Sequence, residues 1–298
     1  MTPTPPPESL ALLQQITEAA HLPAHGAEVI RLAENDLWRL PAHGGIVVRI
    51  ARAGQDQAAA REVALTRWLA DHQLPAVIPL DMDQPVQAAG RSATFWEELP
   101  AHHAGKPHDL APLLLQLHTL PAPDHLPLPP VDPFVRIADR INAARMISAS
   151  DRAFLHNRLK DLRNAWQNLP PGKPSCVIHG DAWGGNVAVT PDGRRYLLDF
   201  ERASLGPPEW DLTSTAVAAD TFGTLTPYEY AKYCNEYGYD VRTYPGYTTL
   251  RAIRELRLTT FALQTADQHL PAHDEATYRL SCLQGHHGPR PWYWRAVI

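Results

Sequence analysis

The sequence has few of the residues that build disulfide frameworks or Cys/His metal sites. Cysteine occurs only three times, at scattered positions and never in a CxxC spacing. Three thiols cannot all pair, so neither a disulfide framework nor a zinc ribbon is indicated. Histidine is more frequent but dispersed, and the adjacent pairs His102-His103 and His286-His287 would point apart on regular structure. The composition therefore gives no support to a Cys/His metal site.

Long apolar runs and blocks of like charge are also missing. No apolar run approaches the ~20 residues that a bilayer requires, and the proline-rich start lacks the basic and apolar regions of a secretory signal. The formal net charge is −5 without any strongly basic stretch, so we expect no membrane and no nucleic acid as partner. We expect a cytoplasmic protein whose 298 residues form two packed lobes.

The first hundred residues predict a small lobe with a sheet. Apolar residues at helical spacing after Ser9, a capping residue, predict one helix, and a second is predicted over 56–71. Short apolar stretches lie between the two helices and after the second one. They are separated by turn-forming segments such as Ala33-Glu34-Asn35-Asp36 and Ala89-Gly90-Arg91. These stretches predict strands at 28–32, 37–40, 46–50, 77–80 and 93–98. The order indicates a mixed, mainly antiparallel sheet with one helix against it.

Beyond Pro100 the pattern becomes mostly helical. Thr226-Pro227-Tyr228-Glu229 has the residue order of a capped helix start. A short apolar strand at 176–178 and a hairpin around Pro191-Asp192-Gly193 interrupt the helices. Further helices are predicted at 110–120, 134–147 and 152–169, and the hairpin strands at 186–190 and 196–200. We therefore place one domain at 1–100 and a second at 101–298.

One segment combines the groups that phosphoryl transfer requires. An apolar strand leads into His179-Gly180-Asp181, Asn186 follows five residues after the aspartate, and another strand ends near Asp199. A carboxylate must orient and deprotonate the attacking hydroxyl, and acid and amide oxygens must hold Mg²⁺ against the nucleotide phosphates. Each part alone has a plain structural explanation, such as an Asx-turn or a solvated strand end. Their joint spacing between strands favours a phosphoryl-transfer site.

These motifs resemble the catalytic and metal-binding loops of the aminoglycoside-phosphotransferase and choline-kinase family, which is related to the protein kinases. The resemblance is strong over 177–212 and weaker over the rest of 28–215. Two further likenesses support it. Trp210-Asp211-Leu212 resembles the family's aspartate that opens the next helix and steadies the catalytic loop, and Leu117-His118 resembles a helix ending that the family shares.

The resemblance implies an α+β, bilobal protein-kinase-like fold, with a small N-lobe built on a mainly antiparallel sheet and a larger helical C-lobe. It implies Asp181 as the catalytic base and Asn186 and Asp199 as the Mg²⁺ ligands. We expect His179 to support the loop through a hydrogen bond rather than to transfer a proton. Trp183, within the loop, is placed to touch a substrate. Asp211 is assigned a structural role.

Glu201 admits two interpretations. It follows Asp199 by two residues, so on an extended chain both side chains would lie on one face. A second metal contact is one possibility, and an ion pair with Arg202 or Arg195 is the other.

The resemblance also implies a nucleotide site in the first lobe. Arg49 stands where many kinases have the phosphate-binding lysine, and Glu62 is its natural partner; a surface arginine on an edge strand is the alternative explanation. The phosphate-covering turn lacks a G-x-G-x-x-G pattern but retains Asn35, as many relatives do. Backbone groups of Glu97-Glu98-Leu99 are expected to bond the purine base, which leaves ATP and GTP undistinguished.

The acceptor is not specified by the helical part. From Glu201 onward the sequence has eleven acidic and nine basic residues. This surplus of acidic residues is too small to indicate the acidic groove that a polycationic acceptor favours. Tyr230, Tyr233 and Tyr237 recur at helical spacing, which fits core packing; an aromatic-lined pocket is the alternative.

The predicted function is an ATP- or GTP-dependent phosphotransferase that uses Mg²⁺ and acts on a hydroxyl of a small molecule. The expected acceptor is an antibiotic or other natural product, which would mean antibiotic resistance or tailoring. Alternatives are a primary-metabolite kinase of the choline, sugar or amino-alcohol type, and a non-catalytic nucleotide-binding protein. Retention of Asp181, Asn186 and Asp199 argues against the last. The expected assembly is a monomer or a homodimer.

Overall fold

A computed structural model describes residues 5–32 and 35–297 of the chain. It divides into two compact units, each drawn from separate stretches of sequence. The first comprises Met1–Asp109, Leu120–Leu128 and Gly184–Ala203, and the second Leu110–Thr119, Pro129–Trp183 and Ser204–Ile298. Ala33 and Glu34 of the first predicted turn, and the first four residues of the proline-rich start, lie outside the described residues. No helix in the described part of the chain is long and apolar enough to span a membrane.

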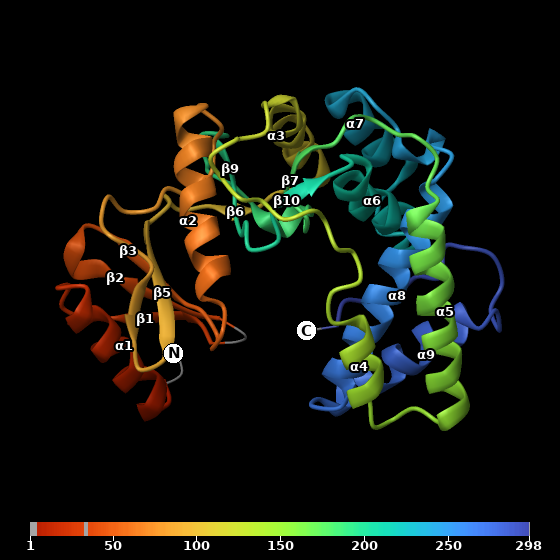
Figure 1. Cartoon of the computed structure of the whole chain (residues 1–298), viewed down its shortest axis with the longest axis horizontal. Helices are drawn as coiled ribbons and strands as arrows, with labels where there is room; N and C mark the ends of the chain where they lie inside the picture. The colour runs from red at the N-terminus through yellow and green to blue at the C-terminus, as the bar shows by residue number, and fades with distance from the viewer. Residues whose placement is uncertain (1–4, 33–34, 298) are drawn as a thin grey trace. The chain divides into compact units, whose positions relative to one another are not determined.

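The first unit is built on a five-stranded sheet (Figure 1). Its strands are β1 (Glu28–Arg31), β2 (Asp36–Leu40), β3 (Ile46–Ile50), β4 (Val86–Ala88) and β5 (Arg91–Glu97), in the order β1-β2-β3-β5-β4. Every neighbouring pair is antiparallel, so this sheet is not mixed. The order places β3 in the middle of the sheet.

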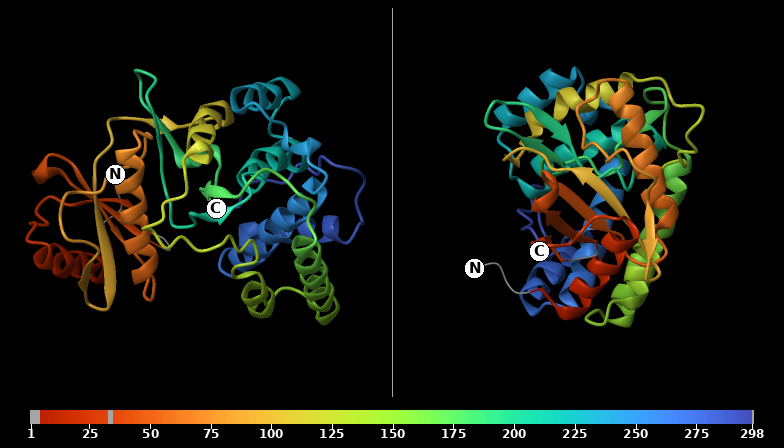
Figure 2. Two further views of the ribbon diagram at one scale, coloured as in Figure 1. Left: turned by 45° about the horizontal axis from the view of Figure 1, so that its top comes forward. Right: turned by 90° about the vertical axis from the view of Figure 1, so that its left-hand side faces the viewer.

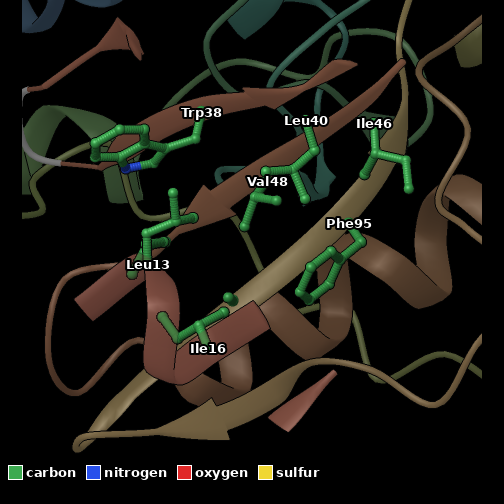
Figure 3. Close-up of a cluster of buried hydrophobic side chains, with 9 residues drawn as sticks. Leu13, Ile16, Trp38, Leu40, Ile46, Val48 and Phe95 are labelled. Atoms are coloured by element: carbon green, nitrogen blue, oxygen red, sulfur yellow. The ribbon is translucent and has the colours of Figure 1, made fainter. Parts of the chain in front are cut away.

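Two helices flank this sheet on opposite sides, as Figures 1 and 2 show. Helix α1 (Pro7–Ala19) turns Leu13 and Ile16 toward the sheet, where they pack with Trp38, Val48 and Phe95 in a buried cluster (Figure 3). The predicted cap at Ser9 is wrong. The helix begins at Pro7 because proline, with its fixed φ, suits the first helical position. Helix α2 (Asp56–Asp71) has the predicted bounds.

The strands of this sheet differ from the prediction in two places, 77–80 and 86–88. Within residues 77–80 only Pro79 forms an isolated bridge, to Trp96, and the segment is not a strand, because Pro79 has no N–H to donate to a ladder. Strand β4 has no counterpart among the predicted strands of this sheet. It joins β5 through Ala89 and Gly90, both at positive φ (49° and 70°), the conformation of a two-residue hairpin turn with the strand twist built in.

A smaller three-stranded sheet carries the predicted hairpin. The 3₁₀ turn η2 (Gly184–Asn186) leads into β8 (Val187–Val189), which pairs with β9 (Arg195–Leu197) and with β6 (His103–Ala104). A Cβ at Gly184 would lie 2.5 Å from the carbonyl oxygen of Gly105, so only glycine permits this close approach. The hairpin is confirmed, but its second strand ends at Leu197, since Asp199 has a φ of 61° and cannot continue an extended chain.

The second unit is mainly helical. Strands β7 (Cys176–Ile178) and β10 (Ser204–Gly206) form an antiparallel pair. The helices are α4 (Ile137–Ala143), α5 (Ala149–Gln167), α6 (Glu209–Val217), α7 (Pro227–Tyr237), α8 (Tyr247–Ala266) and α9 (His273–Leu283), while α3 (Pro107–Thr119) contributes its larger part. Helix α8 packs against α4, α5, α6 and α9 and forms the centre of the unit (Figures 1 and 2).

Most helix predictions in this unit are confirmed within a few residues. Thr226 caps α7, and its hydroxyl and the Glu229 carboxylate form the predicted capping box. Helix α4 is shorter than predicted because Arg136, at a φ of 65°, stands outside the helical region. Tyr230 and Tyr233 are buried in the helical packing. The predicted α+β class, with an antiparallel sheet near the N-terminus and a mostly helical remainder, is confirmed.

Candidate active site

Most residues of the predicted nucleotide and metal site line one cavity of the first unit. The cavity has a volume of about 490 Å³. Apolar side chains make up much of its wall, with a few charged and amide groups among them, a combination typical of small-ligand pockets. The predicted site residues along it are Arg49, Glu62, Glu97, Glu98, Leu99, Asn186 and Asp199, and the apolar ones include Leu37, Val47, Val77, Trp96 and Leu198.

Arg49 is the centre of an ion-pair cluster in this cavity. Its guanidinium bonds the Glu62 carboxylate, as predicted, and its Nη2 lies 2.8 Å from Glu201 Oε2 and 3.3 Å from Asp199 Oδ1. The side chain is only 13% exposed, and it projects from β3 in the middle of the sheet. The alternative of a surface arginine on an edge strand is therefore wrong.

Glu62 is buried where α2 faces this cluster. Its Oε1 accepts a hydrogen bond of 3.0 Å from the backbone N–H of Phe200. Burial raises the pKa of the Glu62 carboxyl to about 7, although the Arg49 charge acts in the opposite direction. Near neutral pH this carboxyl is therefore close to its titration point, while the arginine stays charged.

Glu201 belongs to the same cluster. Besides Arg49, its carboxylate accepts a hydrogen bond of 3.1 Å from Asn35 Nδ2 and lies 3.6 Å from Arg52 Nη2. Glu201 thus forms an ion pair, but with Arg49 and Arg52 and not with the predicted Arg195, which bonds Asp109 at 2.9 Å. Asn35 is held beside the cluster by this contact.

Asn186 and Asp199 lie at the same end of the β8–β9 hairpin. The backbone N–H of Leu198 donates to the Asn186 carbonyl at 3.0 Å, which brings the two segments together. Asp199 adopts a left-handed backbone conformation, which costs a non-glycine residue about 1–2 kcal/mol, and such strain is concentrated at functional sites. Its side chain is 44% exposed and reachable from the cavity.

The donor chemistry of this pair fits Mg²⁺. Both side chains offer hard oxygens, and Mg²⁺ typically takes one or two protein ligands and completes its shell with water and phosphate oxygens. Among the described residues, no group of three or more His, Cys, Asp or Glu side chains is placed to hold a metal by itself. A metal at Asn186 and Asp199 would therefore depend on the nucleotide for its remaining ligands.

In the second unit, Asp181 follows β7 in a loop that a buried carboxylate holds. Asp211, in the first turn of α6, accepts hydrogen bonds from the backbone N–H groups of His179 (2.7 Å) and Gly180 (2.8 Å). The Asp181 N–H donates to His179 Nδ1 at 3.4 Å. Both contacts place His179 and Asp211 beneath the loop, the arrangement expected of supporting residues. Trp183 is 54% exposed and available for contact.

A comparison with known proteins decides the family. The model of the phosphotransferase enzyme family (APH) matches residues 10–253, most of the chain. The chain belongs to this phosphotransferase family. No curated protein matches the sequence at a significant level.

Solved structures share the fold of this phosphotransferase. An amicoumacin kinase in complex with AMP-PNP, Ca²⁺ and Ami is 12% identical, with a TM-score of 0.70 over 95% of this chain and 93% of that one. A spectinomycin phosphotransferase with ADP and spectinomycin is 15% identical, with a TM-score of 0.62 over 90% and 91%. The choline kinase LicA from Streptococcus pneumoniae is 16% identical, with a TM-score of 0.62 over 91% and 98%. The predicted resemblance and the kinase-like fold are thereby confirmed.

Two residues around the loop of this phosphotransferase escaped the site prediction. His118, on α3, places Nε2 3.1 Å from Asp211 Oδ2 and Nδ1 2.8 Å from the Tyr237 hydroxyl. Its only signal in the sequence was the helix ending Leu117-His118. These contacts connect the carboxylate beneath the loop to α3 and α7.

The second is Arg254 on α8. Its Nη2 lies 3.2 Å from Asp181 Oδ1, and the arginine is only 12% exposed. The two residues are 73 positions apart in sequence, so no local pattern could have paired them. The contact fixes the direction of the Asp181 carboxylate.

Proposed function

We propose that this protein transfers the γ-phosphoryl group of ATP or GTP to a hydroxyl group of a small molecule. The observation that carries the proposal is the grouping of Arg49, Glu62, Asn186 and Asp199 around one cavity of the first unit. Phosphoryl transfer needs a cation for the phosphates, a carboxylate that holds this cation in place, and hard oxygens for a divalent metal ion. The guanidinium of Arg49 can bind phosphate through two N–H groups.

Each residue of the nucleotide side has a stated task in this proposal. Arg49, held by Glu62, binds phosphate oxygens, and Asn35 keeps Glu201 beside it. Asn186 and Asp199 hold Mg²⁺, which when bound neutralises charge on the nucleotide phosphates. Backbone groups of Glu97-Glu98-Leu99 contact the purine base.

Asp181 performs the chemistry on the acceptor. It orients the hydroxyl and accepts its proton while the hydroxyl oxygen forms a bond to the γ-phosphorus and the bond to the nucleoside diphosphate breaks. Arg254 fixes the direction of the carboxylate, and Asp211 holds the backbone from which it projects. Trp183 offers an exposed aromatic face to the acceptor.

We further propose an antibiotic or other natural product as acceptor, with a primary metabolite as the alternative. Proteins of both kinds share the fold, among them a spectinomycin phosphotransferase and a choline kinase. An acceptor panel, scored by mass spectrometry for a phosphate adduct, separates the two.

The test of the proposal is Asp181→Asn. We expect turnover to fall about 10²- to 10⁴-fold, the usual contribution of a general base, while Mg²⁺ with nucleotide still raises the melting temperature of the variant. Asp192→Asn is a matched control, since Asp192 is an exposed carboxylate in the turn of the β8–β9 hairpin, and it should retain full activity. Turnover of Asp181→Asn close to that of the control would refute the role. Failure of Mg²⁺ and nucleotide to stabilise the wild-type protein would favour a protein without this activity.

A further inference from the structure

The second unit contains a separate cavity of about 420 Å³. It is formed by the segments around η3 (Ala218–Phe222), the start of α7, η4 (Val241–Thr243), the first turns of α8 and the C-terminal segment. None of the residues assigned above to nucleotide, metal or base lines it. The polar side chains along its wall are Asp220, Thr226, Tyr230, Arg242, Arg251 and Arg290.

Two of the three guanidinium groups are matched by carboxylates that do not line the cavity. Arg242 bonds Asp240 at 3.0 Å through Nη2. Arg290 makes two hydrogen bonds to the buried Glu255, of 2.6 and 2.7 Å. These bidentate contacts fix both arginines in place and satisfy much of their donor capacity.

Arg251 is different. Among the described residues it makes no hydrogen bond, and its buried Nε has no acceptor. Its nearest carboxylate, Asp220, is 3.6 Å away, and Asp220 also accepts the Tyr247 hydroxyl at 2.7 Å and lies 3.7 Å from Arg242. Arg251 keeps 22% of its side chain exposed. Arg251 thus has an ion pair with Asp220 and lies over the Tyr247 ring at 5.4 Å, but within the described part of the chain none of its five donors makes a hydrogen bond. An oxyanion in the cavity would supply acceptors for the guanidinium.

The position of Arg251 relates the cavity to the reacting hydroxyl. Arg251 and Arg254 are three residues apart on α8, and residues at this spacing lie about 5–6 Å apart on one helix face. Arg254 contacts Asp181. The two arginine side chains therefore leave α8 from Cβ atoms about 5–6 Å apart, which is within the span of a small molecule.

We propose that this cavity binds an oxyanion, a carboxylate or a phosphate, that belongs to the acceptor. The inference rests on the proposed function and specifies its substrate class: a hydroxylated acid, in contrast to a polycationic aminoglycoside or choline. A planar guanidinium fork matches carboxylate and phosphate oxygens alike. The small acidic surplus of this region is consistent with that choice, because a cationic acceptor would favour an acidic groove.

Direct binding tests the site without turnover. We titrate four proteins by calorimetry with L-malate, inorganic phosphate, glycerol and choline. The proteins are wild type, Arg251→Gln, Arg251→Lys and the control Arg194→Gln, which changes an exposed arginine of the hairpin turn. We expect malate or phosphate to bind wild type and control, about 10- to 100-fold more weakly to Arg251→Gln, with partial retention in Arg251→Lys. Whichever of malate and phosphate binds more tightly identifies the preferred group. The same titration of Arg49→Gln tests whether the anion binds at the nucleotide cavity instead.

The acceptor panel then separates this inference from the proposed function. With an anionic acceptor, Arg251→Gln should raise the acceptor KM about 10- to 100-fold and leave the nucleotide KM unchanged. Turnover of only neutral or cationic acceptors, or equal anion affinity in wild type and Arg251→Gln, overturns the anion site while leaving the kinase assignment intact. Anion binding that depends on Arg251, in a protein with no phosphotransfer at all, overturns the kinase assignment and with it the link between this site and an acceptor. An Arg251→Gln melting temperature near that of wild type shows that the variant folds, and Arg251→Lys provides the same comparison if it does not.

Discussion

The carboxylate of Asp211 offers a quantitative test of how the proposed catalytic loop is held. Its two oxygens accept the N–H groups of His179 and Gly180 at 2.7 and 2.8 Å, and the side chain is fully buried. Asp211→Asn keeps the shape but presents an NH₂ group to one of these N–H donors. One charge-assisted hydrogen bond, worth about 1.5–3 kcal/mol, is then lost, and a buried donor is left unpaired at a further cost of about 1–3 kcal/mol.

The expected destabilisation of Asp211→Asn is therefore about 3–5 kcal/mol. For a chain of this size the melting temperature should fall by about 6–10 °C, measured by calorimetry or by circular dichroism. We also expect kcat to fall while nucleotide affinity persists, because the proposed nucleotide residues belong to the first unit. Asp192→Asn, which changes an exposed carboxylate bonded to Thr190 and Arg194, should change stability by no more than about 1 kcal/mol. An Asp211→Asn melting temperature within 1–2 °C of wild type would show that the carboxylate does not hold the loop.

Two further predictions concern the charged groups. Burial raises the pKa of Glu62 to about 7 from an ordinary 4.5, so the contribution of Glu62 to stability is complete below pH ~4.5 and is lost as the pH rises through 7. Relative to Glu62→Gln, the free energy of unfolding of wild type should fall by up to about 3 kcal/mol across that window. Denaturant melts that show a constant stability difference between the two proteins would contradict the assignment. Arg254→Gln should lower kcat about 10- to 100-fold through misorientation of Asp181, while nucleotide Kd stays unchanged; an equal loss of nucleotide affinity would show a general structural defect instead.

The sequence predicted the helices and turns that are determined by neighbouring residues, such as capping residues and apolar periodicity. Helix α2 has its predicted bounds, and the cap of α7 follows directly from the order Thr, Pro and Glu. Strand β4 was not predicted because its three residues are too few to show a strand pattern in the sequence, and its conformation depends on pairing with β5. Residues 77–80 lie beside β5 and form only separate backbone hydrogen bonds with it, because Pro79 interrupts a continuous ladder.

The candidate site divides in the same way. Asp181, Asn186 and Asp199 stand within one short stretch, so their spacing was readable. Arg254 and His118 come from distant helices, and their contacts depend on tertiary packing that no spacing rule encodes. The left-handed backbone of Asp199 was not predicted either, because an aspartate after an apolar strand gives no signal for a positive φ.

The ion-pair cluster around Arg49 has a consequence for the form in which a nucleotide is accepted. Arg49 and Arg52 stand against three carboxyl groups, those of Glu62, Asp199 and Glu201. A bare triphosphate would add several negative charges to a group that already has more acids than bases. Charge compensation therefore favours arrival of the nucleotide as its metal complex. If Asn186 and Asp199 held a divalent cation, its charge would offset that of the phosphates, and Asp199 would give up its contact with Arg49 while the Glu62 and Glu201 contacts remained.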